Sequence, residues 1–213
     1  MRRLPVYLVL DVSGSMFGEP IEAVKAGVLS MQSALRKDPQ ALESAYISVL
    51  TFSDQVKQVV ELTEVAGFTV PELKAGGSTS LGLALKEVTK CANAEVTKTT
   101  ASEKGDWKPM VFIMTDGTPT DDITSGLSDF KAYKWGVVVA CAAGSGARTD
   151  VLTQIAGENV VVLETADSNS IAAFFRWVSS SISTTSKKVE SGSDLSGLNT
   201  LPPPPSEISL FKN

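Results

Sequence analysis

Histidine is absent from the 213 residues of this sequence, and cysteine occurs only twice. Without histidine, the chain cannot build a Ser-His-Asp triad, a Cys-His dyad or a histidine-based zinc site. Cys91 and Cys141 lie far apart, form no CxxC pair and are too few for a disulfide framework. We therefore expect two buried, reduced thiols in a cytoplasmic protein.

Long apolar runs and clusters of basic side chains are also missing. No run approaches the roughly 18 to 20 apolar residues of a membrane helix. The apolar start, Met1–Asp11, is short, contains a proline and lacks a small-residue cleavage site, so it indicates a buried strand rather than a signal peptide. A net charge of −5 argues against nucleic acid as the main partner, because phosphate binding needs a concentrated basic face. These absences indicate a soluble protein with neither a membrane nor a nucleic acid partner.

The composition is that of an ordinary globular protein, with 43% hydrophobic and 20% charged residues. A chain of this length can bury one sizeable core. From about Ser186 the sequence becomes rich in serine, glycine and proline, and it includes the run Pro202–Pro205. We therefore predict one domain over residues 1–185 and a tail over residues 186–213.

Apolar runs alternate with amphipathic segments along the chain. Strands are expected over Val6–Leu10, Tyr46–Phe52, Val56–Val60, Pro109–Met114, Val137–Ala142 and Val160–Leu163. Helices are expected from Glu19 to a stop at Pro39, from Leu81 through Ala92, from a cap at Asp121 and Asp122 to about Tyr133, over Asp150–Ala156, and from a cap at Ser168 or Asn169 onward. The alternation predicts an α/β fold with a three-layer, doubly wound and mostly parallel sheet. The short turn Ser53–Gln55 predicts one antiparallel strand at the edge of that sheet.

Three polar loops stand at corresponding places in this pattern, after strands or before a helix. They are Asp11–Ser15, Gly76–Thr79 and Thr115–Gly117. In an open parallel sheet, ligands bind beyond the carboxyl ends of the strands where the strand order reverses. If the first and fourth strands are neighbours there, Asp11 and Asp116 meet, and the loop that carries Thr79 can fold over them.

Two carboxylates and three hydroxyls form an oxygen-only set that suits a hard cation such as Mg²⁺. Ser13 and Ser15 alternate, so both hydroxyls can face one side of a tight loop, while Gly14 allows the bend. If the aspartates act mostly through waters, the ion keeps much of its positive charge. A carboxylate from outside would complete such an ion, which is the physical basis of a docking site. The competing interpretation is that the aspartates cap loops and the serines make turns.

The spacing Asp-x-Ser-x-Ser, a later Gly-Gly-Ser-Thr and a Thr-Asp-Gly, in this α/β order, resembles the von Willebrand factor A (VWA) family. Its Rossmann-like fold carries a metal-ion-dependent adhesion site (MIDAS) with a DxSxS motif, a distant threonine and a distant aspartate. The resemblance places the metal ligands at Asp11, Ser13, Ser15, Thr79 and Asp116, with Mg²⁺, Mn²⁺ or Ca²⁺ as the ion. Family members often have the threonine directly after two glycines, so Ser78 is a rival ligand here. Thr79 is preferred because Gly82, Ala84 and Leu85 then fall at the usual family offsets.

Over roughly residues 1–185, the chain also resembles TerY-type proteins of bacterial tellurite-resistance clusters. The stretches Met1–Ala45 and Glu103–Asp121 carry this likeness, with Arg-Arg-Leu-Pro-Val-Tyr, Gly-Glu-Pro-Ile-Glu-Ala-Val and Lys-Gly-Asp-Trp-Lys-Pro. TerY-like proteins are associated with a protein kinase and a metal-dependent protein phosphatase, which implies a non-catalytic scaffold in phosphorylation signalling. Longer relatives carry a zinc-binding carboxyl-terminal module, and this chain has no cysteine beyond Cys141 to form one.

A metal-dependent hydrolase or phosphatase is the alternative function, because an acid after the first strand beside a metal is similar to phosphatases with DxDxT loops. The second acid of that motif is Ser13 here, and a serine cannot serve as the general acid. Three other features have two interpretations each. Trp107 is a recognition element or covers the sheet edge, Asp121 and Asp122 extend the metal site or cap a helix, and Gly144–Gly146 is a phosphate loop or a turn.

The tail carries apolar side chains near its end. Ile208, Leu210 and Phe211 follow the stiff run Pro202–Pro205. Burying one such side chain is worth about 1.5–3 kcal/mol, so two or three can offset the entropy lost when a stiff segment is ordered. We expect Leu201–Phe211 to dock as an extended segment, either on its own domain or on a neighbouring copy.

Overall fold

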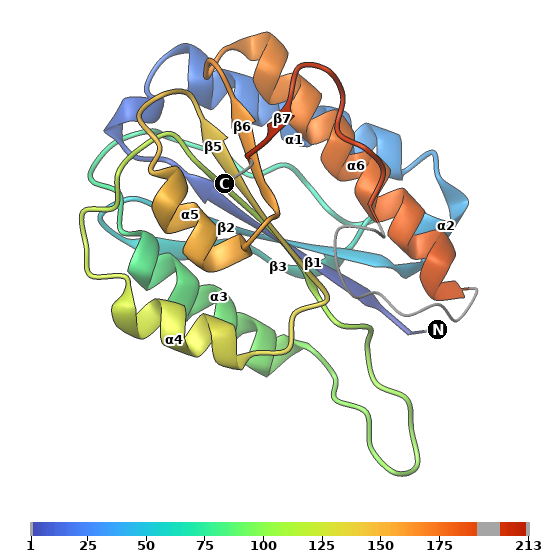
Figure 1. Ribbon diagram of the computed structural model, residues 1–213. Coiled ribbons are helices and arrows are strands. Elements are labelled where there is room, and N and C mark those ends of the chain that lie inside the picture. Colours follow the sequence, from blue (N-terminus) through green and yellow to red (C-terminus); the bar gives the residue numbers. More distant parts are fainter. Residues whose placement is uncertain (1, 191–200, 212–213) are drawn as a thin grey trace.

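The computed structural model describes residues 2–190 and 201–211. At its centre is a seven-stranded sheet with the order β3-β2-β1-β4-β5-β6-β7, and helices cover both faces (Figure 1). The strands are β1 (Leu4–Asp11), β2 (Ala45–Phe52), β3 (Val56–Glu64), β4 (Met110–Thr115), β5 (Val137–Ala143), β6 (Val160–Leu163) and β7 (Ser209–Leu210). The helices are α1 (Glu19–Leu35), α2 (Pro39–Ser44), α3 (Leu81–Glu95), α4 (Thr124–Ala132), α5 (Thr149–Ala156) and α6 (Ser168–Glu190), and a short 3-10 helix, η1 (Gly14–Met16), follows β1. The predicted three-layer, mostly parallel α/β fold is confirmed.

β1 lies in the middle of the sheet because its side chains are covered on both faces. All of its residues from Leu4 to Asp11 are buried, as expected for a strand with helices on either side. β1 pairs in parallel with β2 and with β4. The chain winds from β1 to one side through β2 and β3, and to the other side through β4, β5 and β6. The strand order therefore reverses between β1 and β4. Their parallel pairing confirms the expectation that these two strands are neighbours.

Both edges of the sheet are antiparallel strands. β3 pairs with β2 and forms one edge, as the short turn after β2 predicts. β7 pairs with β6 and forms the other edge. The prediction that Val160–Leu163 is the last strand is therefore wrong, because a strand of two residues is too short to show a pattern in the sequence.

Helices α1, α2 and α6 cover one face of the sheet, and α3, α4 and α5 cover the other (Figure 1). The helices α3 and α4 approach closely because each has a glycine at the contact. A side-chain carbon on Gly126 of α4 would collide with the backbone carbonyl of Gly82 in α3. This contact fixes the start of α3, which directly follows the loop that carries Thr79.

The first helix ends earlier than predicted. α1 stops at Leu35, and Pro39 begins a separate short helix, α2, instead of terminating α1. The carboxylate of Asp38 accepts hydrogen bonds from the amides of Gln40 and Ala41 at 3.1 and 3.2 Å. An aspartate at the N-cap followed by proline is a strong helix start, so Pro39 marks a helix boundary as predicted, but it begins α2 and does not end α1.

The cap of α6 is also different from the prediction. Asp167 occupies the capping position, and its Oδ1 accepts from the amides of Asn169 and Ser170 at 2.9 Å each. Ser168 and Asn169, the predicted caps, are the first two residues of the helix. A carboxylate one residue earlier takes the role because it is a stronger acceptor for amides at the positive end of the helix.

The C-terminal segment, residues 201–211, docks on its own domain, one of the two expected alternatives. Ile208 is buried in the core on the α6 side of the sheet. The indole nitrogen of Trp177 in α6 donates to the carbonyl of Pro202 at 2.8 Å. α6 itself continues to Glu190, past the predicted boundary between residues 185 and 186. Residues 191–200, the first part of the predicted tail after α6, lie outside the described residues.

Three further features can be compared with the predictions. Both cysteines are free and buried, as expected; burial is the main cause that raises the pKa of the Cys91 thiol to about 11, and burial also raises the pKa of the Cys141 thiol. Trp107 packs against the core, with the Arg2 guanidinium 3.7 Å from its ring centroid, which favours a covering role over an exposed one. Among the described residues, no helix is both long and apolar enough to cross a membrane.

Candidate metal centre

Three loops meet beyond the carboxyl ends of β1 and β4, and backbone hydrogen bonds join two of them. The amide of Gly14 donates to the carbonyl of Gly77 at 2.9 Å, and the amide of Gly76 donates to the carbonyl of Val12 at 2.8 Å. Gly77 has a φ of +83°, a conformation that side-chain-bearing residues rarely adopt. The loop before α3 is therefore held over the loop after β1 by the main chain itself.

Asp11 lies at the end of β1 and is only 1% exposed. Its Oδ1 accepts from the amide of Ser13 at 2.8 Å, and its Oδ2 accepts from the hydroxyl of Thr115 at 2.5 Å. Burial raises the pKa of Asp11 above its ordinary value; the hydrogen bonds from Ser13 and Thr115 lower it only in part, and the charge of Asp116 raises it again. A buried carboxylate that is incompletely compensated favours a cation beside it.

Hydrogen bonds connect the other predicted side chains in a row. The hydroxyl oxygens of Ser13 and Ser15 are 3.0 Å apart, and Ser15 Oγ donates to Asp116 Oδ1 at 2.6 Å. Thr79 Oγ1 lies close to Ser15 Oγ. Both oxygens lie near Gly117: a side-chain carbon on that glycine would stand 3.2 Å from Thr79 Oγ1 and 3.8 Å from Ser15 Oγ. The structure thus brings all five predicted side chains together at the switch point.

Ser78, the rival to Thr79, is engaged elsewhere. Its amide and its hydroxyl both donate to Asp54 Oδ1, at 2.8 and 2.7 Å. These hydrogen bonds, first that of the hydroxyl and then that of the amide, lower the pKa of Asp54. Thr79 is 6% exposed, and its hydroxyl lies beside Ser15. This arrangement favours Thr79 over Ser78 as the residue that faces the site.

Three residues that position the site were not identified as such from the sequence. Thr115 donates to Asp11, and Asp54 at the tip of the β2–β3 turn holds the Gly77–Ser78 peptide. Thr120 makes two hydrogen bonds with Thr79: its hydroxyl accepts from the Thr79 amide at 3.1 Å, and its amide donates to the Thr79 carbonyl at 2.9 Å. Each contact joins loops that are far apart in the sequence, so only the position of Thr115 beside Asp116 could have signalled its role.

The donor set fits a hard divalent cation. It combines two carboxylates with three hydroxyls, and these are the oxygen ligands that Mg²⁺, Mn²⁺ and Ca²⁺ take. Among the described residues there is no group of three or more His, Cys, Asp or Glu side chains that could hold a metal. A metal at this place would therefore depend on the serine and threonine hydroxyls as well as on Asp11 and Asp116.

Two alternative interpretations of nearby residues are now resolved. Asp121 accepts from the amides of Gly82 and Leu83 at 3.1 and 2.9 Å, so it caps α3 rather than the predicted α4. Asp122 accepts from the amide of Thr124 at 2.9 Å and belongs to the start of α4. Both carboxylates therefore accept amides from the first turn of a helix, Asp121 at α3 and Asp122 at α4, although the N-cap positions themselves are Ser80 and Ile123.

The residues Gly144–Gly146, which could have been a phosphate loop, form a turn between β5 and α5. The hydroxyl of Thr118 donates to the carbonyl of Gly146 at 3.4 Å, and a side-chain carbon on Gly146 would stand 2.6 Å from the carbonyl of Asp116. The turn therefore supports the backbone that presents Asp116.

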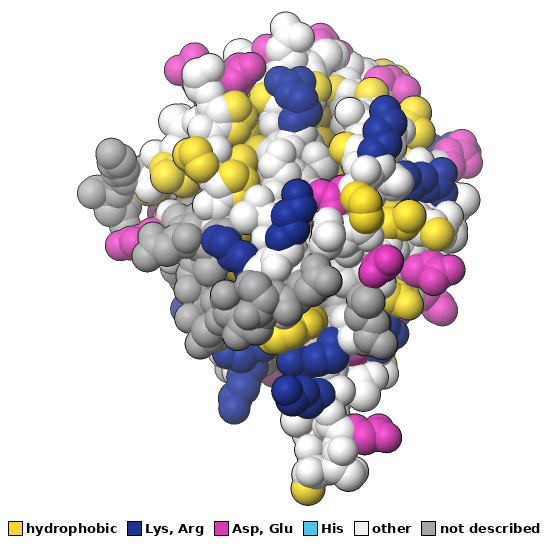
Figure 2. Space-filling model, turned by 90° about the vertical axis from the view of Figure 1, so that its right-hand side faces the viewer, with side chains coloured by type: hydrophobic (Ala, Val, Ile, Leu, Met, Phe, Trp, Pro, Cys, Tyr) yellow, Lys and Arg dark blue, Asp and Glu magenta, His cyan; other side chains and the backbone are white. Residues whose placement is uncertain are grey.

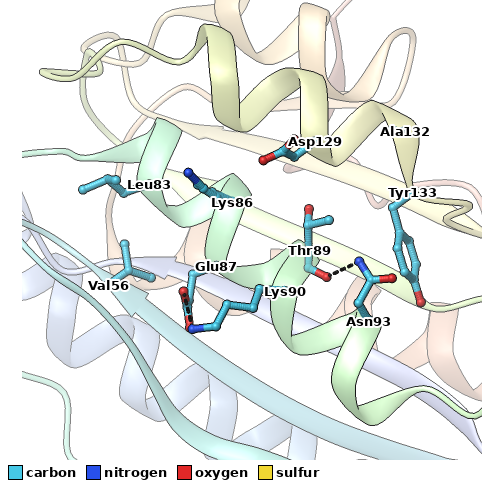
Figure 3. Close-up of a pocket in the computed structure, with 10 residues that line it drawn as sticks. All are labelled: Val56, Leu83, Lys86, Glu87, Thr89, Lys90, Asn93, Asp129, Ala132 and Tyr133. Carbon is cyan, nitrogen blue, oxygen red and sulfur yellow. Dashed lines mark hydrogen bonds and ion pairs between the residues drawn. The ribbon is translucent and has the colours of Figure 1, made fainter.

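A sizeable hollow in the described part of the chain lies away from this site. It lies along α3, between the start of β3 and α4, has a volume of about 780 Å³, and is bordered by residues such as Leu83, Lys86 and Tyr133 (Figure 3). Within it, Lys90 pairs with Glu87 at 2.9 Å and Asn93 donates to the carbonyl of Thr89 at 3.0 Å. None of the five predicted ligand residues borders this hollow.

Comparison with known proteins identifies one family. The model of the von Willebrand factor type A domain matches residues 6–177. An uncharacterized protein of Synechocystis, sll0103, is 34% identical over 123 residues, which cover 54% of this chain and 26% of that protein. The chain thus spans about a quarter of the length of this curated relative.

Solved structures support the same fold. A von Willebrand factor type A protein from Catenulispora acidiphila superposes with a TM-score of 0.66 at 16% identity, covering 86% of this chain and 43% of that one. Proximal thread matrix protein 1 from the mussel byssus, in a structure described as having a zinc-occupied MIDAS motif, gives 0.61 at 19% identity, covering 84% and 48%. At these identities, the likeness concerns the fold.

Proposed function

Since the chain belongs to the von Willebrand factor type A domain family, we propose that it binds a partner protein through a divalent metal ion. VWA domains generally mediate protein interactions and often use a MIDAS to do so. The ligands that we propose are the five side chains gathered at the switch point: Asp11, Ser13, Ser15, Thr79 and Asp116. We propose Mg²⁺ as the ion, with Mn²⁺ or Ca²⁺ as substitutes.

One observation carries this proposal. The hydrogen-bonded row from Asp11 through Ser13 and Ser15 to Asp116 crosses from β1 to β4 at the point where ligands bind in open α/β sheets. A row of oxygens that is already gathered needs little rearrangement to turn its lone pairs toward one cation. The buried, incompletely compensated Asp11 gives that cation an electrostatic reason to bind.

The same geometry explains how the site would recognise a partner. A bound divalent cation supplies a Lewis-acidic centre for an external carboxylate. Ser13, Ser15 and Thr79 are neutral, so they orient the ion without cancelling its charge. The exposed Ser15 and the half-buried Asp116 form the accessible side of the site. We therefore propose that the partner contributes an aspartate or glutamate.

A more specific role rests on the resemblance to TerY-type proteins. We propose a cytoplasmic scaffold in tellurite-resistance or stress phosphorylation signalling, with a protein kinase and a metal-dependent protein phosphatase as partners. The division into a domain over residues 1–185 and a tail over residues 186–213 remains part of this proposal.

A metal-dependent hydrolase or phosphatase is the second candidate, and Ser13 is the observation against it. Ser13 is 2% exposed and occupies the position where DxDxT phosphatases have a general acid. Its hydroxyl lies 3.0 Å from that of Ser15, and a serine hydroxyl does not act as an acid near neutral pH. We therefore propose a binding role without catalysis.

The proposed function is tested by capturing partners from a lysate of the native organism on the immobilised chain. We expect partners that are retained in Mg²⁺ and released by EDTA, and that are lost with Asp11→Ala or Ser13→Ala, since the site lies at loop ends and its loss should leave the fold intact. Ser78→Ala is the matched control, because its hydroxyl points to Asp54. Capture that is unaffected by EDTA and by both variants would refute the proposal, and turnover of an aryl phosphate would favour the hydrolase.

A further inference from the structure

A second polar hollow lies at the opposite end of the sheet from the metal centre. It has a volume of about 510 Å³ and is formed by the loop before β4 and the ends of α3 and α4. β4 begins beside it and ends at Thr115, next to the metal centre, so the length of one strand, about 20 Å at 3.3 Å per residue, separates the two sites. Three exposed lysines line this hollow: Lys98, Lys108 and Lys134.

These lysines have no acidic partners within the part of the chain that the structure describes. No ion pair or hydrogen bond involves their ammonium groups there. Figure 2, which faces the side of the molecule where α2 and the N-terminus lie, shows further Lys and Arg side chains around the base of the projecting loop. The local positive charge is notable because the whole chain carries a net charge of −5.

The single carboxylate in the hollow, Asp106, does not neutralise the lysines. Arg3 donates to both of its oxygens, at 3.0 and 2.6 Å, and the amide of Thr97 donates to it at 2.7 Å. Burial would raise the pKa of Asp106, but the hydrogen bonds from Arg3 and Thr97 and the charge of Arg3 together lower it. Asp106 is thus already paired, and the three lysines remain available.

The backbone under the lysines is fixed. The amide of Gly136 donates to the carbonyl of Pro109 at 2.8 Å, and Gly136 also lies against the carbonyl of Lys108. This contact brings the loop that carries Lys108 beside the segment that carries Lys134. A preorganised pair of cations loses less entropy on binding than two cations on mobile loops would.

The hollow continues into the larger one along α3. Asn93, Ala132 and Tyr133 border both, and Figure 3 shows Asn93 and Tyr133 at one end of the larger hollow and Lys86 farther along α3. Lys86 also has no acidic partner among the described residues. Lys86 and Asn93 are seven residues apart on α3, about 10 Å at 1.5 Å per residue. An extended segment of about six residues could therefore run from one hollow into the other.

We propose that this surface, which we call the lysine face, binds an extended acidic segment of a protein partner, with carboxylates beside Lys98, Lys108 and Lys134. An acidic occupant fits because, among the described residues, the unpaired charges that line the smaller hollow are all positive, whereas the unpaired carboxylate of Asp129 borders only the larger one. A protein segment fits better than nucleic acid, since the walls include apolar side chains such as Val96 and Pro109 and the rest of the chain is acidic. The lysine face needs no metal, so it is independent of the proposed MIDAS function.

The test is fluorescence anisotropy with a labelled octaglutamate peptide. The buffer contains EDTA, which removes divalent cations from the metal centre. We expect saturable binding that weakens as salt rises, and no binding of octaglutamine. The double variant Lys108→Glu/Lys134→Glu should lower the affinity at least tenfold, because it replaces two attractions with two repulsions. Lys98→Ala should lower it a few-fold. Lys57→Glu, at an exposed position on the edge strand β3, is the matched control for the single change Lys108→Glu and should lower the affinity far less than that change does.

Three outcomes would overturn the proposal. Octaglutamate that does not bind shows that the lysine face takes no acidic segment. A loss with Lys57→Glu equal to that of the single change Lys108→Glu shows that only total charge matters. Single-stranded DNA that competes more strongly than octaglutamate, at equal charge, identifies nucleic acid as the occupant. Because the assay contains EDTA, none of these outcomes bears on the metal-dependent function.

Discussion

The burial of Asp11 has opposite energetic effects with and without a bound cation. In the metal-free chain its charge is buried, and burial raises its pKa. With a cation beside it, the same charge becomes an attraction. Its hydrogen bonds from Ser13 and Thr115 hold the carboxylate in one orientation in the absence of a metal. Asp11 therefore lowers the stability of the fold without a metal and raises the affinity for a cation, as functional carboxylates in buried sites often do.

This trade gives a prediction with opposite signs in the two states. A carboxyl with a raised pKa in the folded state contributes stability that is present below its unfolded pKa and lost as the pH rises through the folded one. In EDTA, the free energy of unfolding of Asp11→Asn minus that of the wild type should therefore increase as the pH rises from 4 to 7. At Mg²⁺ concentrations of about 100 times the dissociation constant, the wild type should gain about 2.7 kcal/mol and the variant nothing.

Urea unfolding at both pH values, with and without Mg²⁺, measures these differences. Ser78→Ala serves as the control, since it alters a neighbouring hydroxyl that faces Asp54. The account of Asp11 is wrong if Mg²⁺ stabilises Asp11→Asn as much as the wild type.

At the scale of elements, the close contact of α3 and α4 holds the start of α3 in place. Asp121, from the loop before α4, caps α3, while Gly82 and Gly126 allow the two backbones to touch. Thr79 comes just before α3 and is gripped by Thr120 from the same loop. The position of the proposed ligand therefore depends on how these two helices pack.

Gly126→Ala tests this dependence. Alanine normally favours a helix over glycine, but here the added carbon would meet the carbonyl of Gly82, which cannot rotate away. We expect a loss of about 1–3 kcal/mol in the free energy of unfolding, the usual cost of overpacking, together with weaker metal binding. Ser125→Ala, an exposed change one residue away, should stay within about 0.5 kcal/mol. Thermal unfolding of the wild type and the two variants measures these differences. If Gly126→Ala is as stable as Ser125→Ala, the close contact between α3 and α4 is contradicted.

The sequence predicts the elements of this fold better than their ends. The strand that became β1 was clear because a continuous apolar run ends at an acid, and the hairpin was clear because Ser53–Gln55 leaves room only for a tight turn. α2 was missed because six residues are too few to show helical periodicity. Asp121 is predicted to cap α4 but caps α3, and the cap of α6 is Asp167 rather than Ser168 or Asn169, because several acids and hydroxyls adjoin these helix starts and only geometry selects among them.

The site shows the same division. Its five predicted side chains could be chosen from the sequence because each stands in a short motif after a strand or before a helix. Thr120 and Asp54 could not, since their role is a hydrogen bond to a loop some 20 to 40 residues away. The preference for Thr79 over Ser78 comes from the family offsets in the sequence, and the structure adds a physical reason, because Asp54 engages the hydroxyl of Ser78.

At the scale of the whole molecule, the C-terminal segment closes the sheet edge that β6 would otherwise leave open. An open edge is a place where other chains can add a strand. Residues 201–211 cover it through β7, through the buried Ile208, and through the hydrogen bond between Trp177 and Pro202. Within the proposed tail, residues 201–211 therefore supply the outermost strand of the sheet.

Ile208→Asp should release this segment. Burying the isoleucine is worth about 1.5–3 kcal/mol, so its loss should raise the open population roughly 10- to 100-fold. Chymotrypsin should then cleave at Phe211 and Leu210 faster by a similar factor, as followed by mass spectrometry. Ser206→Ala, at an exposed position in the same segment, should leave the rate unchanged. Equal cleavage of the wild type and Ile208→Asp would mean that Ile208 does not hold the segment.

The central claim, a cation at the switch point between β1 and β4, is tested most directly by calorimetric titration of Mn²⁺ or Mg²⁺ into the chain. We expect one ion per chain, binding that is abolished by Asp11→Asn and by Asp116→Asn, and binding that Thr79→Val weakens at least tenfold. Ser78→Ala should change the affinity less than twofold. A titration without saturable binding, or one in which Asp11→Asn binds the ion as the wild type does, would contradict the account.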